Sequence, residues 1–124
     1  MQPHYESLHA SMEALGALCA LVMGLVLWQR ARRDSGAQPL ALAAGFLGMG
    51  VLEMFHAVSP PGNAFILLRH LASLVGGIGF ACVWLPGRRD RPIQHAVPWL
   101  VAAGALVCGV AVMLARDTLP DMMR

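Results

Sequence analysis

The sequence predicts an all-α integral membrane protein, a four-helix transmembrane bundle in one domain that covers residues 1–124. Hydrophobic residues make up 57% of the chain and charged residues only 13%. An average soluble domain has about 25% charged residues. The chain therefore has too little polar surface to coat a soluble globule, and a bilayer is the expected solvent.

Four apolar segments supply the predicted helices, and each approaches the roughly 20 residues that a helix needs to span a bilayer. They cover about residues 8–28, 40–58, 64–85 and 96–115. The breakers "RARRDSGAQP", "SPPGN" and "PGRRDRP" separate them. The first segment carries its arginines after the apolar run, which is the reverse of a signal peptide. We therefore expect it to be a retained helix.

The arginines predict the orientation. Two groups lie between predicted spans, one after the first span and one between the third and fourth: Arg30, Arg32, Arg33, Arg88, Arg89 and Arg91. The N-terminal segment and "SPPGN" contain no arginine or lysine. By the positive-inside rule, both arginine-rich loops are cytoplasmic. Both termini are then periplasmic, and the protein is expected in the bacterial inner membrane.

Five polar residues fall near the periplasmic ends of the first three spans. Among the seven acidic residues, Glu13 and Glu53 are the two inside spans. His9 precedes Glu13 by four positions, and His56 follows Glu53 by three, so each pair shares one helix face about 5–6 Å apart along the axis. His70 lies about two turns into the third span, at a similar depth. We expect these residues to form one layer.

This residue set predicts a transition-metal site. Ionised side chains inside a bilayer need partners, and two neighbouring carboxylates repel unless a proton or cation lies between them. Imidazole and carboxylate together bind zinc, copper, iron or nickel. The predicted ligands are His9, Glu13, Glu53, His56 and His70, with zinc as the first choice and copper the next. A metal-free, proton-linked network is an alternative. Haem held by His56 and His70 is another, although it leaves the carboxylates without a role.

Three stretches also carry a family resemblance. "LHASMEALGAL", "AAGFLGMGVLEMFHA" and "LLRHLASLVGGIGFACVWLP" resemble the membrane-associated sensor domains of the MASE type, found at the N-termini of bacterial histidine kinases and diguanylate cyclases. The family's His-x-x-x-Glu motif falls on His9 and Glu13, and its acidic-x-x-His motif on Glu53 and His56. The resemblance covers about residues 7–86. It departs at Glu53, where the family usually has aspartate, and in the "SPPGN" loop.

The resemblance implies a sensory input module of a two-component or similar signalling protein, fused to a cytoplasmic output domain. No output domain is present in this sequence, so we expect a sensor fragment of a longer protein and no enzymatic activity. The expected partners are the bilayer, that output domain and a second copy held through small-residue helix faces. A small membrane redox protein and a proton-linked transport component are the alternatives. The sequence has no glycine-rich phosphate loop and no exposed basic face for nucleic acid.

Overall fold

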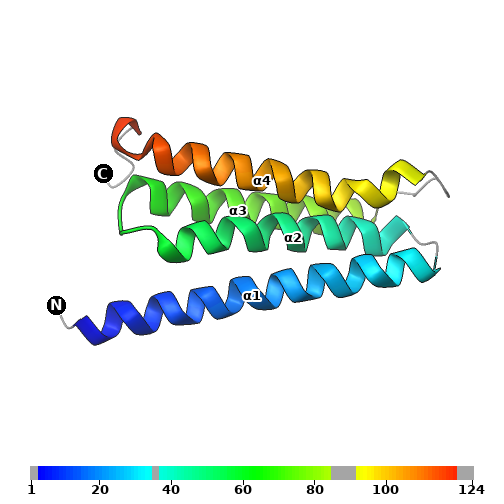
Figure 1. The fold of residues 1–124 in the computed structure, drawn as a ribbon, viewed down its shortest axis with the longest axis horizontal. Helices are drawn as coiled ribbons and strands as arrows, with labels where there is room; N and C mark the ends of the chain where they lie inside the picture. The colour runs from blue at the N-terminus through cyan, green and yellow to red at the C-terminus, as the bar shows by residue number, and fades with distance from the viewer. Residues whose placement is uncertain (1–2, 35–36, 85–91, 120–124) are drawn as a thin grey trace.

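The structure is a computed structural model that describes residues 3–34, 37–84 and 92–119 (Figure 1). Its four α-helices are α1 (Pro3–Asp34), α2 (Ala37–Val58), α3 (Asn63–Cys82) and α4 (Val97–Leu114). Two short 3₁₀ helices, Pro92–Ala96 and Arg116–Thr118, flank α4. The described residues contain no strand. The all-helical prediction is confirmed.

All four helices are long and apolar enough to cross a membrane, as the apolar segments predicted. The first helix differs most from its predicted bounds, because α1 continues past Trp28 to Asp34. Arginine and alanine are good helix formers, and Arg32 and Arg33 lie in the last turn, where cations interact favourably with the helix dipole. The second arginine group, Arg88, Arg89 and Arg91, lies outside the described residues.

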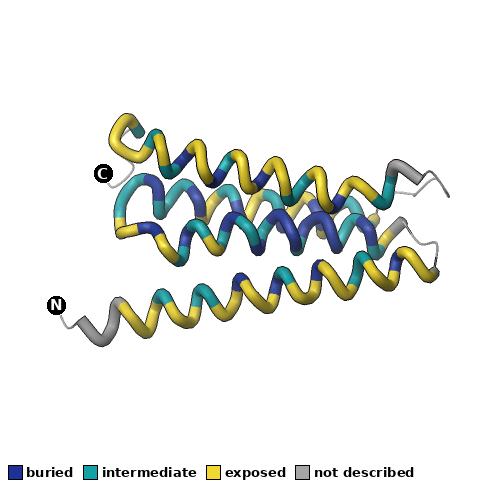
Figure 2. Tube along the Cα trace, in the orientation of Figure 1, coloured by how far each residue is buried: buried dark blue, intermediate teal, exposed yellow. Residues whose placement is uncertain are grey.

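The helix α2 occupies the centre of the molecule. It packs along α1, α3 and α4, whereas α3 and α4 make far fewer contacts with each other. Figure 2 shows the resulting pattern, in which buried positions concentrate on α2 and the outer helices bury one side each. The close approach to α3 depends on two glycines, because a Cβ added to Gly79 would lie 2.5 Å from the Cα of Gly45. Small residues thus bring these helices into backbone contact.

Large apolar side chains cover the outside of the bundle. On α1 alone the exposed ones are Leu8, Met12, Leu15, Leu18, Val22, Met23, Leu25 and Val26. Soluble monomers rarely expose a continuous apolar surface of this kind. The three cysteines are all free. The arrangement is consistent with a multi-pass membrane protein.

The two ends of the bundle differ in character. At one end, here called the Ser59 end, the turn Ser59–Gly62 lies beside the start of α1 and the end of α4 (Figure 1). At the opposite end, the indole nitrogen of Trp28 donates a hydrogen bond to the carbonyl of His95 at 3.1 Å. The Trp28 ring also meets Trp99 edge-on, and Arg32 lies over its face. Tryptophans of this kind are enriched at membrane–water interfaces.

Candidate functional site: a His–Glu–Arg cluster at the Ser59 end

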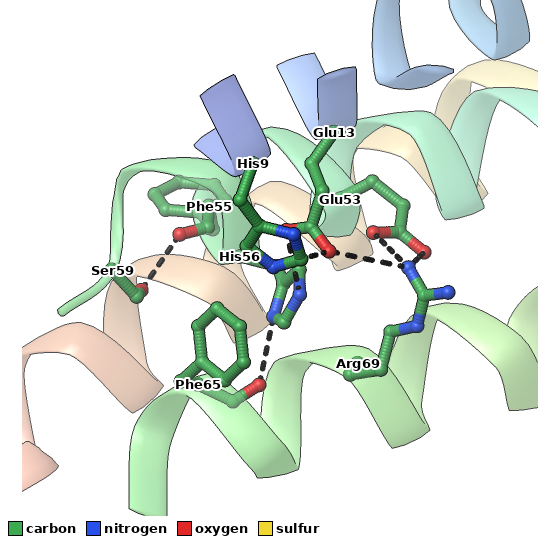
Figure 3. A network of polar contacts seen from close by, with 8 residues as sticks. All are labelled: His9, Glu13, Glu53, Phe55, His56, Ser59, Phe65 and Arg69. Atoms are coloured by element: carbon green, nitrogen blue, oxygen red, sulfur yellow. Dashed lines mark hydrogen bonds and ion pairs between the residues drawn. The ribbon is translucent and has the colours of Figure 1, made fainter. Parts of the chain in front are cut away.

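The first half of the site comes from one turn of α1. His9 and Glu13 lie four residues apart, and the Nε2 atom of His9 is 3.3 Å from Oε1 of Glu13. The His9 side chain is half exposed, whereas that of Glu13 is 14% exposed. Their helical spacing predicted this contact. Glu13 points inward, toward α2 and α3 (Figure 3).

The inner partner of Glu13 is His56, at the end of α2. The Nε2 atom of His56 lies 2.8 Å from Oε2 of Glu13. Within the described part of the chain, His56 supplies the only polar contact of that buried oxygen. His56 itself is 1% exposed. The two residues therefore form a buried pair that joins α1 to α2.

The orientation of the His56 ring is set by α3. Its Nδ1 atom lies 2.8 Å from the carbonyl oxygen of Phe65. A carbonyl only accepts hydrogen bonds, so Nδ1 carries a hydrogen and donates it. Nε2 is then the ring nitrogen that faces Oε2 of Glu13, at 2.8 Å. The Phe65 ring packs on the imidazole, with ring centroids 3.8 Å apart.

A cation that the sequence reading missed completes the cluster. The Nη1 atom of Arg69, on α3, lies 3.2 Å from both carboxylate oxygens of Glu53. The same atom is 3.9 Å from Oε1 of Glu13. We expected two neighbouring carboxylates to need a proton or a cation between them. Arg69 provides that cation, and Figure 3 shows it reaching from α3 toward the two glutamates.

Two details of the predicted layer come out differently. Glu53 and His56 do not share a partner, because Glu53 pairs with Arg69 and His56 with Glu13. His70 stands apart from the other four residues. It is exposed, and its Nδ1 atom bonds to the carbonyl of Ile66 in its own helix. The structure thus joins four of the five predicted residues, His9, Glu13, Glu53 and His56, in one cluster. His95 lies at the opposite end of the bundle, beside Trp28.

Ser59 is a second residue that the sequence reading did not single out. Its buried hydroxyl donates to the carbonyl of Phe55 at 2.7 Å and lies 3.1 Å from the sulfur of Met113. The first contact caps the last turn of α2, and the second ties that turn to α4. Ser59 therefore fixes the segment that carries His56.

Two cavities flank the cluster. One of about 440 Å³ lies between α1, α2 and α3, with Gly16, Ala17 and Met49 on its apolar wall and Arg69 among its polar lining. The other, of about 180 Å³, lies toward the turn and is lined in part by Ser59 and Phe65. His9 and Glu13 line both. A small ion can therefore approach Glu13 from either side.

The metal prediction remains open. Among the residues that the structure describes, no three His, Cys, Asp or Glu side chains already stand in an arrangement that could hold a metal ion. The Nε2 atoms of His9 and His56 nevertheless face the two oxygens of the same carboxylate, that of Glu13.

Comparison with protein-family models, with curated proteins and with solved structures finds no match to this chain. The resemblance to MASE-type sensor domains therefore rests on the His, Glu and Gly motifs alone and stays a prediction.

Proposed function

We propose that the chain is a membrane-embedded sensory input domain that binds a transition-metal ion at the Ser59 end, zinc first and copper next. The observation that carries the proposal is the placement of the Glu13 carboxylate between the Nε2 atoms of His9 and His56. Two imidazoles and one carboxylate are a frequent protein ligand set for zinc that leaves a fourth position open. The role is binding and signalling, with no turnover.

The environment of His56 supports this proposal. Metal-binding histidines usually donate their second ring nitrogen to a carbonyl or carboxylate, which fixes the ring. His56 does so through Nδ1 and the carbonyl of Phe65. The cavity of about 180 Å³ beside His9 and Glu13 provides the entry path that such a site needs. Nε2 of His56 is then the ring nitrogen left to bind an ion.

A metal-free cluster is the second candidate, and Arg69 is the observation that favours it. Its charge already lies between the carboxylates of Glu13 and Glu53. In that case the cluster fastens α1 to α2 and α3 through ion pairs and hydrogen bonds, and a stimulus acts by breaking them.

For signalling, we propose that ligand binding draws the outer ends of α1 and α2 together. The shift would pass along α2, which contacts the other three helices, toward a cytoplasmic output domain. Small shifts of packed helices are a common way to carry such signals. In this arrangement the Ser59 end is periplasmic, and the arginine-rich end of α1 is cytoplasmic.

Zinc binding is tested by thermal unfolding of the protein in mild detergent. At free zinc about 100 times Kd, we expect stabilisation by roughly 2.7 kcal/mol, because the ion binds only the folded state. Glu13→Gln, which can still hydrogen-bond to His56, should lose most of this shift. His70→Gln is the matched control and should keep it, since His70 lies outside the cluster.

Two results would decide between the candidates. Zinc or copper that copurifies and is removed by chelator, with a fall in melting temperature, supports the metal site. A melting temperature that responds to neither chelator nor added metal supports the metal-free cluster, in which these residues join the helices through ion pairs and hydrogen bonds. If His70→Gln also loses the zinc-dependent stabilisation, His70 is a ligand as well, as the sequence predicted.

The orientation has a separate test. With the three native cysteines replaced, a cysteine at Gly62 should react with a membrane-impermeant reagent from the periplasm. A Cβ at Gly62 meets no atom within 4 Å, so the substitution is tolerated. A cysteine at Gly36 should react only after the inner membrane is permeabilised. The reverse labelling would place the cluster on the cytoplasmic side and remove the case for a periplasmic signal.

A further inference from the structure

We propose that Arg69 is a built-in competitor for the metal ion: it neutralises Glu13 when the site is empty and thereby sets the affinity for a divalent cation. This inference rests on the proposed metal site. It goes further by assigning a role to a residue outside the ligand set.

The contacts of Glu13 place the competition at one atom. Oε2 of Glu13 faces His56 at 2.8 Å, whereas Oε1 faces both His9, at 3.3 Å, and Arg69, at 3.9 Å. An ion that binds His9 as well as His56 comes near Oε1, because Nε2 of His9 faces that oxygen. The guanidinium and the ion are both positive, so each lowers the occupancy of the other near that oxygen.

The charges of the cluster show what Arg69 changes. Glu13 and Glu53 contribute two negative charges and Arg69 one positive charge, which leaves a net charge of −1 when both imidazoles are neutral. Without Arg69 the same site carries −2. The attraction between the ion and the site grows with the product of their charges. The site should therefore bind a divalent ion much more tightly when Arg69 is replaced by a neutral residue.

Arg69 has a place to withdraw to. Its side chain is 55% exposed, and its shorter contacts, both 3.2 Å, are to Glu53 rather than to Glu13. Long arginine side chains readily move their charged ends toward water while the stem stays on the protein. Arg69 can therefore stay paired with Glu53 while Glu13 binds the metal ion. The pairing with Glu53 draws Arg69 away from Glu13 and so limits how strongly Arg69 opposes the ion.

The experiment is a calorimetric titration of zinc chloride into the metal-free full chain in detergent. Arg69→Gln should bind zinc at least about tenfold more tightly than the wild type, because a positive charge that repels the ion at short range is removed. Arg69→Lys keeps the charge and should stay within a few-fold of wild type. Glu53→Gln should bind at least about tenfold more weakly, because Arg69 is then left with Glu13 alone.

The double variant Glu53→Gln with Arg69→Gln closes the cycle. It carries the same net charge as the wild type and should return close to wild-type affinity, which separates the pairwise effect from the single changes. It also covers the case in which Arg69→Gln folds poorly, because Glu53 is then neutral and Glu13 keeps its contacts with His9 and His56. The comparison is then between Glu53→Gln and the double variant.

The outcomes separate the two proposals. If the wild type binds zinc and removal of Arg69 tightens binding in neither background, Arg69 is only a structural ion pair and this inference is overturned. If neither the wild type nor Arg69→Gln binds zinc, the metal site itself is wrong. Zinc binding by Arg69→Gln but not by the wild type would support competition in its strongest form.

Discussion

Replacement of His56 by leucine is expected to destabilise the folded protein by about 3–5 kcal/mol, the cost of removing one partner of a buried pair. His56 is 1% exposed and makes the only described polar contact of the buried Oε2 atom of Glu13. Leucine fills a similar space but has no polar atom to face that oxygen. Oε1 of Glu13 would keep His9 and Arg69, but the buried Oε2 would remain shielded without a polar partner among the described residues. The helix α1 would also lose its innermost polar link to α2.

The cost should come mainly from the buried Oε2 atom of Glu13, which has no other described polar contact, and a double variant tests this. Replacement of both His56 and Glu13 by leucine removes the unpaired group, and apolar replacement of a whole buried pair is often neutral or stabilising. The double variant should therefore recover much of the loss in thermal or denaturant unfolding in detergent. A near wild-type midpoint for His56→Leu alone would show that the pair contributes little. Equal losses in the single and double variants would instead assign the cost to packing against Phe65.

The depth of the polar residues was predictable from the sequence, and their directions were not. Helix rise placed His9, Glu13, Glu53, His56 and His70 near one level. The direction in which a side chain points, however, turns by 100° from one helical residue to the next. The neighbours Arg69 and His70 point about 100° apart, and it is Arg69 that faces the glutamates. Depth alone could not choose between them.

The same geometry explains why Glu53 and His56 have different partners. A separation of three residues leaves side chains about 60° apart around a helix. On α2, the central helix, that angle is enough for His56 to meet α1 and for Glu53 to meet α3. The partner of each residue depends on how α1 and α3 pack around α2, which the local sequence does not predict.

One sequence signal for Arg69 was available. It is the only arginine inside the four predicted spans. A charged side chain within a span needs a partner, and two unpaired glutamates were already present at that depth. Charge balance would therefore have placed Arg69 in the cluster.

The other large effect on stability is expected where α2 meets α3. Gly79→Val is expected to destabilise the fold by about 3 kcal/mol, at the upper end of the usual cost of overpacking. A Cβ at Gly79 would meet the Cα and N atoms of Gly45 and the carbonyl oxygen of Ala41, at 2.5, 3.0 and 3.2 Å. All three are backbone atoms, so no side-chain rotation relieves the contact and the helices have to separate.

Gly77 provides the matched control, because it lies two residues earlier on α3 and a Cβ there meets nothing within 4 Å. Gly77→Val places the same side chain on the same helix and should leave the unfolding midpoint nearly unchanged. Separation of α2 from α3 would also pull Glu53 from Arg69 and His56 from the carbonyl of Phe65, since each contact joins these two helices. Gly79→Val should therefore lose zinc-dependent stabilisation as well as stability, while Gly77→Val keeps both. Equal effects at the two positions would mean that α2 and α3 do not meet through Gly45 and Gly79.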